Sequence, residues 1–262
     1  MNRVGRFFEN LLFPPKCVGC RKLFQKNILD PCETPYCDRC RLSWEREKGE
    51  SCPDCGLEMF RCRCGGKLAE SVGVSDCIKL VSYQKERETV GRRAVLYMKK
   101  HSNRVAVSFF AEQLSYPLRR YMDEHMLTHD DVVLCCVPRG RKSVDQYGFD
   151  HAEKLCVQLA KQVGVKALPE LLYRQRTKSR EQKKLTTEER AQNASGAFAV
   201  DDKLLASLGT AKCLFIVDDV ITTGASIGGC ATLLRRGYDG PIVAICIART
   251  AIGRRKSAKV RG

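Results

Sequence analysis

Short apolar runs alternate with longer amphipathic stretches along most of this chain. Buried strands are predicted by apolar runs at residues 78–83, 132–137, 213–217 and 242–247, with shorter candidates at 171–172 and 198–200. Apolar side chains at helical spacing predict helices over residues 86–100, 105–121, 149–163 and 225–236. Strands that alternate with helices indicate an α/β fold, with a mostly parallel sheet flanked by helices.

In the first 66 residues the main feature is closely spaced pairs of cysteines. Nine of the 16 cysteines lie between Cys17 and Cys64, and eight of these form three Cys-x-x-Cys pairs and one Cys-x-Cys pair. Eight thiolates are enough for two tetrahedral zinc sites. Sequential sites need shorter loops than interleaved ones, so we expect two groups: Cys17, Cys20, Cys37 and Cys40, and then Cys52, Cys55, Cys62 and Cys64. Cys32 is left over.

A disulfide framework is the alternative use of these cysteines. No secretory signal precedes them, and most later cysteines lie in apolar runs, where a reduced thiol packs as a small hydrophobic side chain. No apolar run approaches the length that spans a bilayer. We therefore expect bound zinc in a cytoplasmic protein without a transmembrane segment. Within residues 1–16, an apolar stripe predicts a short amphipathic helix that packs on the protein's own core or touches a membrane surface.

The stretch Phe215 to Ser226, FIVDDVITTGAS, joins a strand pattern to a helix pattern without a gap. Its loop therefore lies at a strand's carboxyl end and a helix's amino end, where backbone N–H groups and the helix dipole attract anions. Asp218 and Asp219 offer charged acceptors to a sugar diol. The expected phosphate-binding residues are Thr222, Thr223, Gly224, Ala225 and Ser226. Together they predict a sugar-phosphate site; the plainer alternative is an Asp-rich turn with a Thr N-cap.

The charge of the chain also favours an anionic ligand. Lys and Arg total 46 against 30 Asp and Glu, which gives a net charge of +16. Two tetra-thiolate zinc sites would lower this to about +12, since each carries about −2. Nucleic acid and phosphate-rich ligands suit this charge, and a merely solvated basic surface explains it equally well.

Two further polar stretches are candidates for chemistry. The loop that follows residue 137 brings Arg139 and Arg141 to the same end of the sheet as Asp218, where their charges could hold a pyrophosphate. Residues 174–198 are polar, rich in Arg and too long for a tight connection, which is typical of an active-site lid. The alternative for this stretch is a solvated surface loop.

The segment at 215–226 resembles the phosphoribosyl-pyrophosphate motif of type I phosphoribosyltransferases. The cysteine ribbons and the string Arg176, Thr177, Gln182, Leu185, Arg190, Asn193, Gly196, Ala197 and Phe198 resemble the ComF family of competence-associated phosphoribosyltransferase-like proteins. The resemblance covers nearly the whole chain. We accordingly divide it into an N-terminal helix (1–16), a double zinc ribbon (17–66), a type I phosphoribosyltransferase-like domain (67–250) and a basic tail (251–262).

The resemblance implies roles for individual residues. Asp218 and Asp219 would hold the ribose hydroxyls, and the loop after them would hold the 5-phosphate. The pyrophosphate, with Mg, would be bound by Arg139, Arg141, Arg176 and Lys99, the last lying where the family often has a Leu-x-Lys-like segment. The chain departs from the family at Tyr147–His151, where Arg-Gly-Phe-Asn-Gln is usual, and Ser226 replaces a usual Thr.

Two classes of function remain open from the sequence. One is an enzyme that transfers phosphoribose to an unidentified acceptor, linked to DNA uptake in natural competence. Displacement of pyrophosphate needs no protein nucleophile, so the histidines need no catalytic role: His101, His125, His129 and His151. The other is a non-catalytic zinc-containing adaptor that binds single-stranded DNA or competence proteins, for which the candidate stacking aromatics are Tyr36, Trp44 and Phe60.

Overall fold

The computed structural model describes residues 14–24, 34–65, 73–84, 86–101, 103–175 and 197–250, apart from the side chains of residues 141–143. The apolar stripe of the predicted N-terminal helix and the basic tail lie outside these residues. In chain order the described elements are α2 (Asp38–Lys48), β1 (Val74–Ser82), α4 (Val90–Lys100), α5 (Arg104–Glu124), β2 (Val132–Cys136), α6 (Arg141–Tyr147), α7 (His151–Val163), β3 (Lys166–Ala167), the 3-10 turn η1 (Pro169–Leu171), β4 (Leu172–Arg174), β5 (Phe198–Val200), α9 (Asp202–Ala206), β6 (Cys213–Ile221), α10 (Ala225–Leu234) and β7 (Ile242–Arg249).

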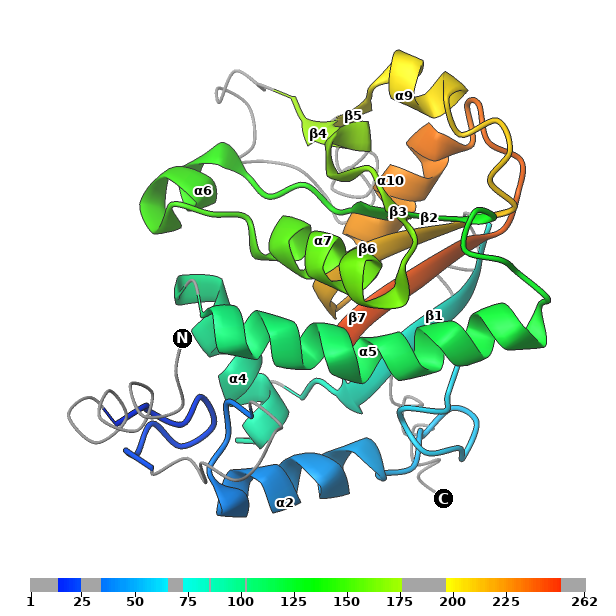
Figure 1. Ribbon diagram of the computed structural model, residues 1–262. Coiled ribbons are helices and arrows are strands. Elements are labelled where there is room, and N and C mark those ends of the chain that lie inside the picture. The colour runs from blue at the N-terminus through cyan, green and yellow to red at the C-terminus, as the bar shows by residue number, and fades with distance from the viewer. Residues whose placement is uncertain are drawn as a thin grey trace, which may run out of the picture.

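The core of the molecule is a five-stranded sheet in the order β1-β7-β6-β2-β3, in which every neighbouring pair is parallel. Helices α4, α5 and α7 cover one face, and α10 with α9 and the β4–β5 pair covers the other (Figure 1). Alternation along β6 explains the two layers: Phe215 and Val217 pack towards α5 and α7, while Leu214 and Ile216 pack towards α10. The predicted α/β fold with a parallel sheet flanked by helices is thus confirmed.

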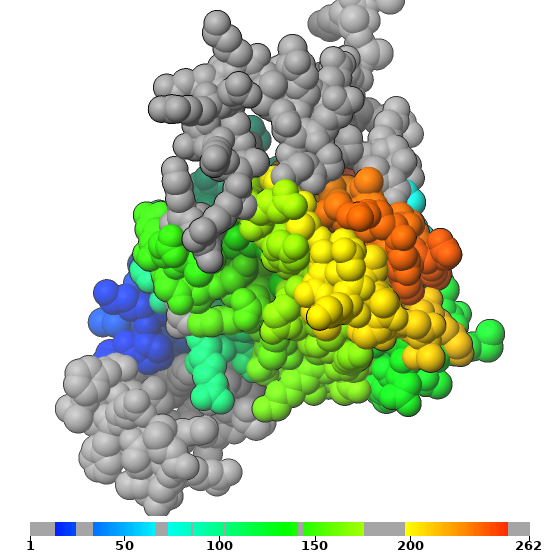
Figure 2. Space-filling view, turned by 90° about the horizontal axis from the view of Figure 1, so that it is seen from above, coloured from blue at the N-terminus to red at the C-terminus, as the bar shows by residue number. Residues whose placement is uncertain are grey.

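Residues 198–200 do not join this sheet, although the sequence analysis counted them among its strands. β5 pairs antiparallel with β4 in a separate two-stranded sheet, with Leu172 opposite Val200. Each of these strands has three residues, and all three pairs of the small sheet join β4 to β5. The fifth strand of the main sheet is instead β3, which sequence patterns miss because it has two residues, neither of them fully buried. In the view from above, the yellow and orange segments that contain α9 and α10 form much of the visible surface, and the described blue segment near the N-terminus lies at one edge (Figure 2).

Three helices were not predicted from the sequence: α2, α6 and α9. α2 lies inside the cysteine-rich segment, where the cysteine spacing hides the helical pattern, and it buries Cys40, Trp44 and Glu47. α6 has seven residues and no apolar stripe, so residues 141–147 were taken for loop. Helices as short as α6 and α9, with seven and five residues, are determined by the contacts at their ends rather than by periodicity.

The cysteine-rich segment packs directly onto the α/β part. Tyr36 and Trp44 are almost fully buried and lie with Phe109 and Phe110 of α5 in one aromatic cluster, with ring centroids 5.4 to 6.3 Å apart. Buried rings such as these cannot stack on nucleic-acid bases. Of the three aromatic candidates for that role, Phe60 alone is exposed.

Candidate functional site

The two acids of the 215–226 motif lie on strand β6 itself, and not in the loop after it. β6 continues to Ile221 because β7 pairs with it as far as Arg249. Consecutive strand residues point to opposite faces, so Asp219 faces α4 and α7 and is 3% exposed, while Asp218 lies towards α10 and is partly exposed. The backbone N–H of Asp219 donates to Oδ1 of Asp218 at 2.8 Å. The pair therefore presents one partly exposed and one enclosed carboxyl group.

Asp219 is enclosed by two nitrogen groups from different helices. Nζ of Lys99, at the end of α4, lies 3.5 Å from its Oδ1, and Nε2 of His151, at the start of α7, lies 2.5 Å from its Oδ2. Burial raises the pKa of Asp219, but the hydrogen bond of His151 and the charge of Lys99 outweigh it, and the net shift is downward. Asp219 is therefore held as a carboxylate.

Asp218 is shifted in the opposite direction. Burial raises its pKa well above the usual value for aspartate, and the neighbouring charge of Asp219 raises it further. The two carboxyl groups thus share the pattern of a coupled acid pair, in which one member keeps its charge and the other resists ionisation. A ligand that brings hydrogen-bond donors or positive charge to Asp218 would relieve this repulsion.

Arg139, in the loop after β2, contacts Lys99 and His151, the two residues that enclose Asp219. Its backbone N–H donates to Asp150 Oδ2 at 2.8 Å, its Nη2 donates to the carbonyl of Lys99 at 3.1 Å, and its Nη1 lies 2.8 Å from Nδ1 of His151. Asp150 is also the N-cap of α7. The structure thus brings Arg139 and Lys99 together with Asp219 at the carboxyl end of the sheet.

The loop between β6 and α10 forms the other side of the site. Thr222, Thr223 and Ser226 are exposed, and Gly224 has φ +83°, a left-handed conformation that favours glycine. The Thr223 hydroxyl accepts from the N–H of Ala225 at 3.3 Å and so caps the first turn of α10. The loop begins at Thr222, after Val220 and Ile221 complete β6, so exposed hydroxyls and a helix N-terminus follow the acid pair at this end of the strand.

Two of the expected phosphate-binding cations cannot be placed. Arg141 begins α6, and its side chain lies outside the described part of the chain. Arg176 and the rest of the expected lid, residues 176–196, lie outside the described residues. His151, by contrast, contacts both Arg139 and Asp219 although the sequence analysis gave it no role. The sequence signal for this role is Asp150 followed by His151 at the start of a predicted helix. Asp150 is the N-cap of α7, so the side chain of the next residue lies at this end of the sheet.

The eight ribbon cysteines fall into the two sequential groups expected: Cys17, Cys20, Cys37 and Cys40, and Cys52, Cys55, Cys62 and Cys64. Within each group the sulfur atoms all lie within 4.8 Å of one another, and all described cysteines are free. The Cys20 and Cys37 sulfurs are 3.8 Å apart, far beyond a disulfide bond of about 2.05 Å. Four sulfurs about 2.3 Å from one tetrahedral zinc ion would be separated by about this distance. Each group could therefore hold a metal ion.

The electrostatics of the cysteine groups fit a cation. Burial and the neighbouring sulfurs, Cys17 among them, raise the pKa of Cys40, and burial with Cys62 and Cys55 raises that of Cys64. Four thiolates this close repel one another unless a positive ion lies between them.

Buried cations also hold the second group against the sheet. Nζ of Lys79, on β1, donates to the carbonyls of Cys62 and Cys64 at 3.1 and 3.0 Å, and Nη1 of Arg249, at the end of β7, donates to Cys64 at 2.6 Å. Both side chains are at most 2% exposed. Their positive charges lie beside the thiolates of the second group. This lowers the free-energy cost of burying the cations and the thiolates.

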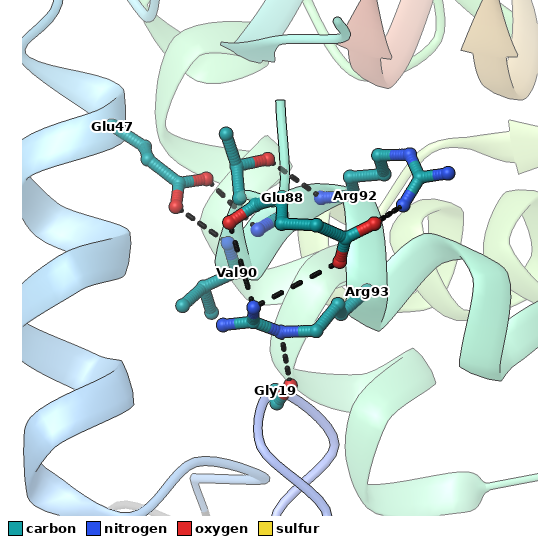
Figure 3. A network of polar contacts seen from close by, with 8 residues as sticks. Gly19, Glu47, Glu88, Val90, Arg92 and Arg93 are labelled. Atoms are coloured by element: carbon teal, nitrogen blue, oxygen red, sulfur yellow. Dashed lines mark hydrogen bonds and ion pairs between the residues drawn. The ribbon is translucent and has the colours of Figure 1, made fainter. Parts of the chain in front are cut away.

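The first group is held against α4. Both carboxylate oxygens of Glu47, on α2, accept backbone N–H groups of α4, from Val90 at 2.6 Å and Gly91 at 2.8 Å (Figure 3). Nε of Arg93 donates to the carbonyl of Gly19, inside the first Cys-x-x-Cys pair, at 2.5 Å. These contacts explain why α4 begins at Val90 and not at residue 86, as its amphipathic pattern suggested. The same helix ends at the Lys99–Asp219 contact.

Comparison with protein-family models and with curated proteins found no match to this chain. Among the described residues, no helix combines the length and apolar composition needed to cross a membrane. The function is therefore argued from the site itself.

Proposed function

We propose that this chain binds phosphoribosyl pyrophosphate with Mg²⁺ and is a phosphoribosyltransferase-like protein of the ComF type. The observation that carries the proposal is the convergence at one end of the sheet of three features: the acid pair on β6, the cations Lys99 and Arg139, and the hydroxyl-rich start of α10. The acids suit a sugar diol, the helix start suits a phosphate, and the cations suit a pyrophosphate. Parallel α/β sheets bind ligands at this end.

Each residue has a defined task in this proposal. Asp218 accepts from the ribose hydroxyls, while Asp219 holds Lys99 and His151 in place. Thr222, Thr223 and Ser226 donate to the 5-phosphate, and Arg139 and Lys99 neutralise the pyrophosphate as it leaves the anomeric carbon. Mg²⁺ bound with the donor would supply further positive charge on the pyrophosphate. No protein nucleophile is required.

The two cysteine groups are proposed to hold one structural zinc ion each, because tetra-thiolate groups favour zinc. Thiolate ligands stay reduced in the cytoplasm, which is the compartment we propose. A link to DNA uptake in natural competence rests on the family resemblance alone.

The test of this function is pyrophosphate release from phosphoribosyl pyrophosphate with Mg²⁺, followed with and without candidate bases. Release that depends on a base supports a transferase. Donor binding without release from any base supports the adaptor function instead. The Asp218→Asn variant should lose donor-dependent activity, and Asp239→Asn, an exposed aspartate before β7 at the other end of the sheet, should keep it.

A further inference from the structure

His151 connects the loop after β2 to the acid pair. Its side chain is 7% exposed, with one ring nitrogen 2.8 Å from Nη1 of Arg139 and the other 2.5 Å from Oδ2 of Asp219. A guanidinium can only donate, so Nδ1 of His151 must accept. The ring proton therefore lies on Nε2, facing the carboxylate. The contact with Arg139 thus favours the tautomer with its proton on Nε2.

The charged groups around His151 come from four elements. Asp219 lies on β6, Lys99 on α4 and Arg139 on the loop after β2, while α7 itself contributes Asp150 and Glu153 at its first turn. The Asp150 carboxylate is already engaged by the N–H groups of Arg139 and of the first turn of α7. The guanidinium of Arg139 thus disfavours protonation of Nδ1. The carboxylate of Asp219 would stabilise the imidazolium that protonation forms.

We propose that His151 is a positioning residue that couples donor binding to proton uptake. This inference rests on the proposed function, since it needs a pyrophosphate that attracts Arg139. When the guanidinium turns from Nδ1 to the ligand's oxygens, Nδ1 loses its donor and gains an N–H bond to a proton from solvent. The imidazolium keeps its contact with Asp219 through Nε2 and adds one positive charge beside the bound pyrophosphate. Asp219 stays oriented in both states.

The direction of the pH dependence follows from linkage. A complex that binds one more proton than the free protein forms more tightly as the pH falls, by up to about tenfold per pH unit. The donor's own phosphate groups also titrate, and that contribution is the same for all variants. The contribution of His151 is therefore the difference between the protein and a variant in which residue 151 does not titrate.

The experiment is calorimetric titration with phosphoribosyl pyrophosphate and Mg²⁺ at pH 6, 7 and 8, in buffers of different ionisation enthalpy. It compares the parent with His151→Gln, whose amide keeps a donor and an acceptor, and with His129→Gln, an exposed histidine. The parent and His129→Gln should take up more protons than His151→Gln, by up to one, and weaken more steeply as the pH rises. Equal proton uptake in all three would overturn the inference. No donor binding by the folded parent would instead overturn the proposed function.

A second measurement does not depend on the variant folding. Nitrogen NMR of labelled histidine in the parent distinguishes a neutral ring from an imidazolium. The His151 signal is assigned by elimination, with Gln variants of the other three histidines, His101, His125 and His129. Addition of donor should change this signal from the neutral form to the imidazolium. A ring that stays neutral in the complex would contradict the proposal.

Discussion

Oε2 of Glu47 accepts the backbone N–H of Gly91 at 2.8 Å, so a carboxylate from the cysteine-rich segment caps a helix of the α/β part. α4 has Thr89 as its own N-cap and uses Glu47 as a second acceptor. The helix dipole strengthens this contact, because the first turn of α4 is positive. The first cysteine group and the acid pair are thus joined by one helix, held by Glu47 at its start and in contact with Asp219 through Lys99 at its end.

Replacing Glu47 by Gln should destabilise the protein by about 1–3 kcal/mol, because the amide has one acceptor oxygen and one of the two buried N–H groups of α4 loses its partner. The measurement is urea unfolding of parent and variant. Glu45→Gln is the matched control: Glu45 lies on the exposed side of α2, in a surface pair with Lys48, and should change stability by less than about 1 kcal/mol. Equal effects of the two changes would contradict the capping role.

Gly91→Ala should also destabilise, through crowding. A Cβ at Gly91 would lie 2.9 Å from Val81 Cγ2 and 3.0 Å from Oε2 of Glu47, closer than side chains approach without movement. Overpacking of this kind costs about 1–3 kcal/mol. Gly49→Ala, where the nearest atom is 3.6 Å away, is the control and should be nearly neutral in the same unfolding assay. A stabilised Gly91→Ala variant would show that α2 and α4 are less closely packed than described.

The metal prediction concerns stoichiometry. Native mass spectrometry should find two zinc ions per chain, and Cys17→Ser or Cys52→Ser should each remove one, because the sulfurs form two separate groups of four. The exposed side of α2 offers a control in Ser43→Ala, which should keep both ions. One ion in the parent, or loss of both from a single replacement, would contradict two independent sites.

The pH dependence of stability has a clear source in Asp131. The backbone N–H and hydroxyl of Thr128, and then Lys212, lower its pKa to about 2. The folded pKa lies below the unfolded value of about 3.9, so the stabilisation is present above pH 4 and is lost as the pH falls from about 4 to about 2. The stability difference between the parent and Asp131→Asn should therefore shrink over that window. Asp130→Asn, an exposed neighbour, should show no such change.

The sheet and the acid pair could be predicted from the sequence because their signals are local. Apolar runs define β2, β6 and β7, and the order strand, acids, small hydroxyl residues and helix is continuous in the chain. The end of β6 could not be predicted, because pairing with β7 decides where the strand ends. The roles of Glu47 and Lys79 could not be predicted either, since Val90 lies 43 residues from Glu47 and Cys64 lies 15 residues from Lys79 along the chain.

The most direct test of donor binding is the melting temperature of the protein with and without phosphoribosyl pyrophosphate and Mg²⁺. A ligand that binds only the folded state raises the melting temperature by mass action. Asp218→Asn removes the partly exposed carboxyl group, and since burial and Asp219 already disfavour its charge, the fold should survive the change. We predict a shift for the parent and for Asp239→Asn, and none for Asp218→Asn. No shift for the parent, or an equal shift for Asp218→Asn, would contradict the account.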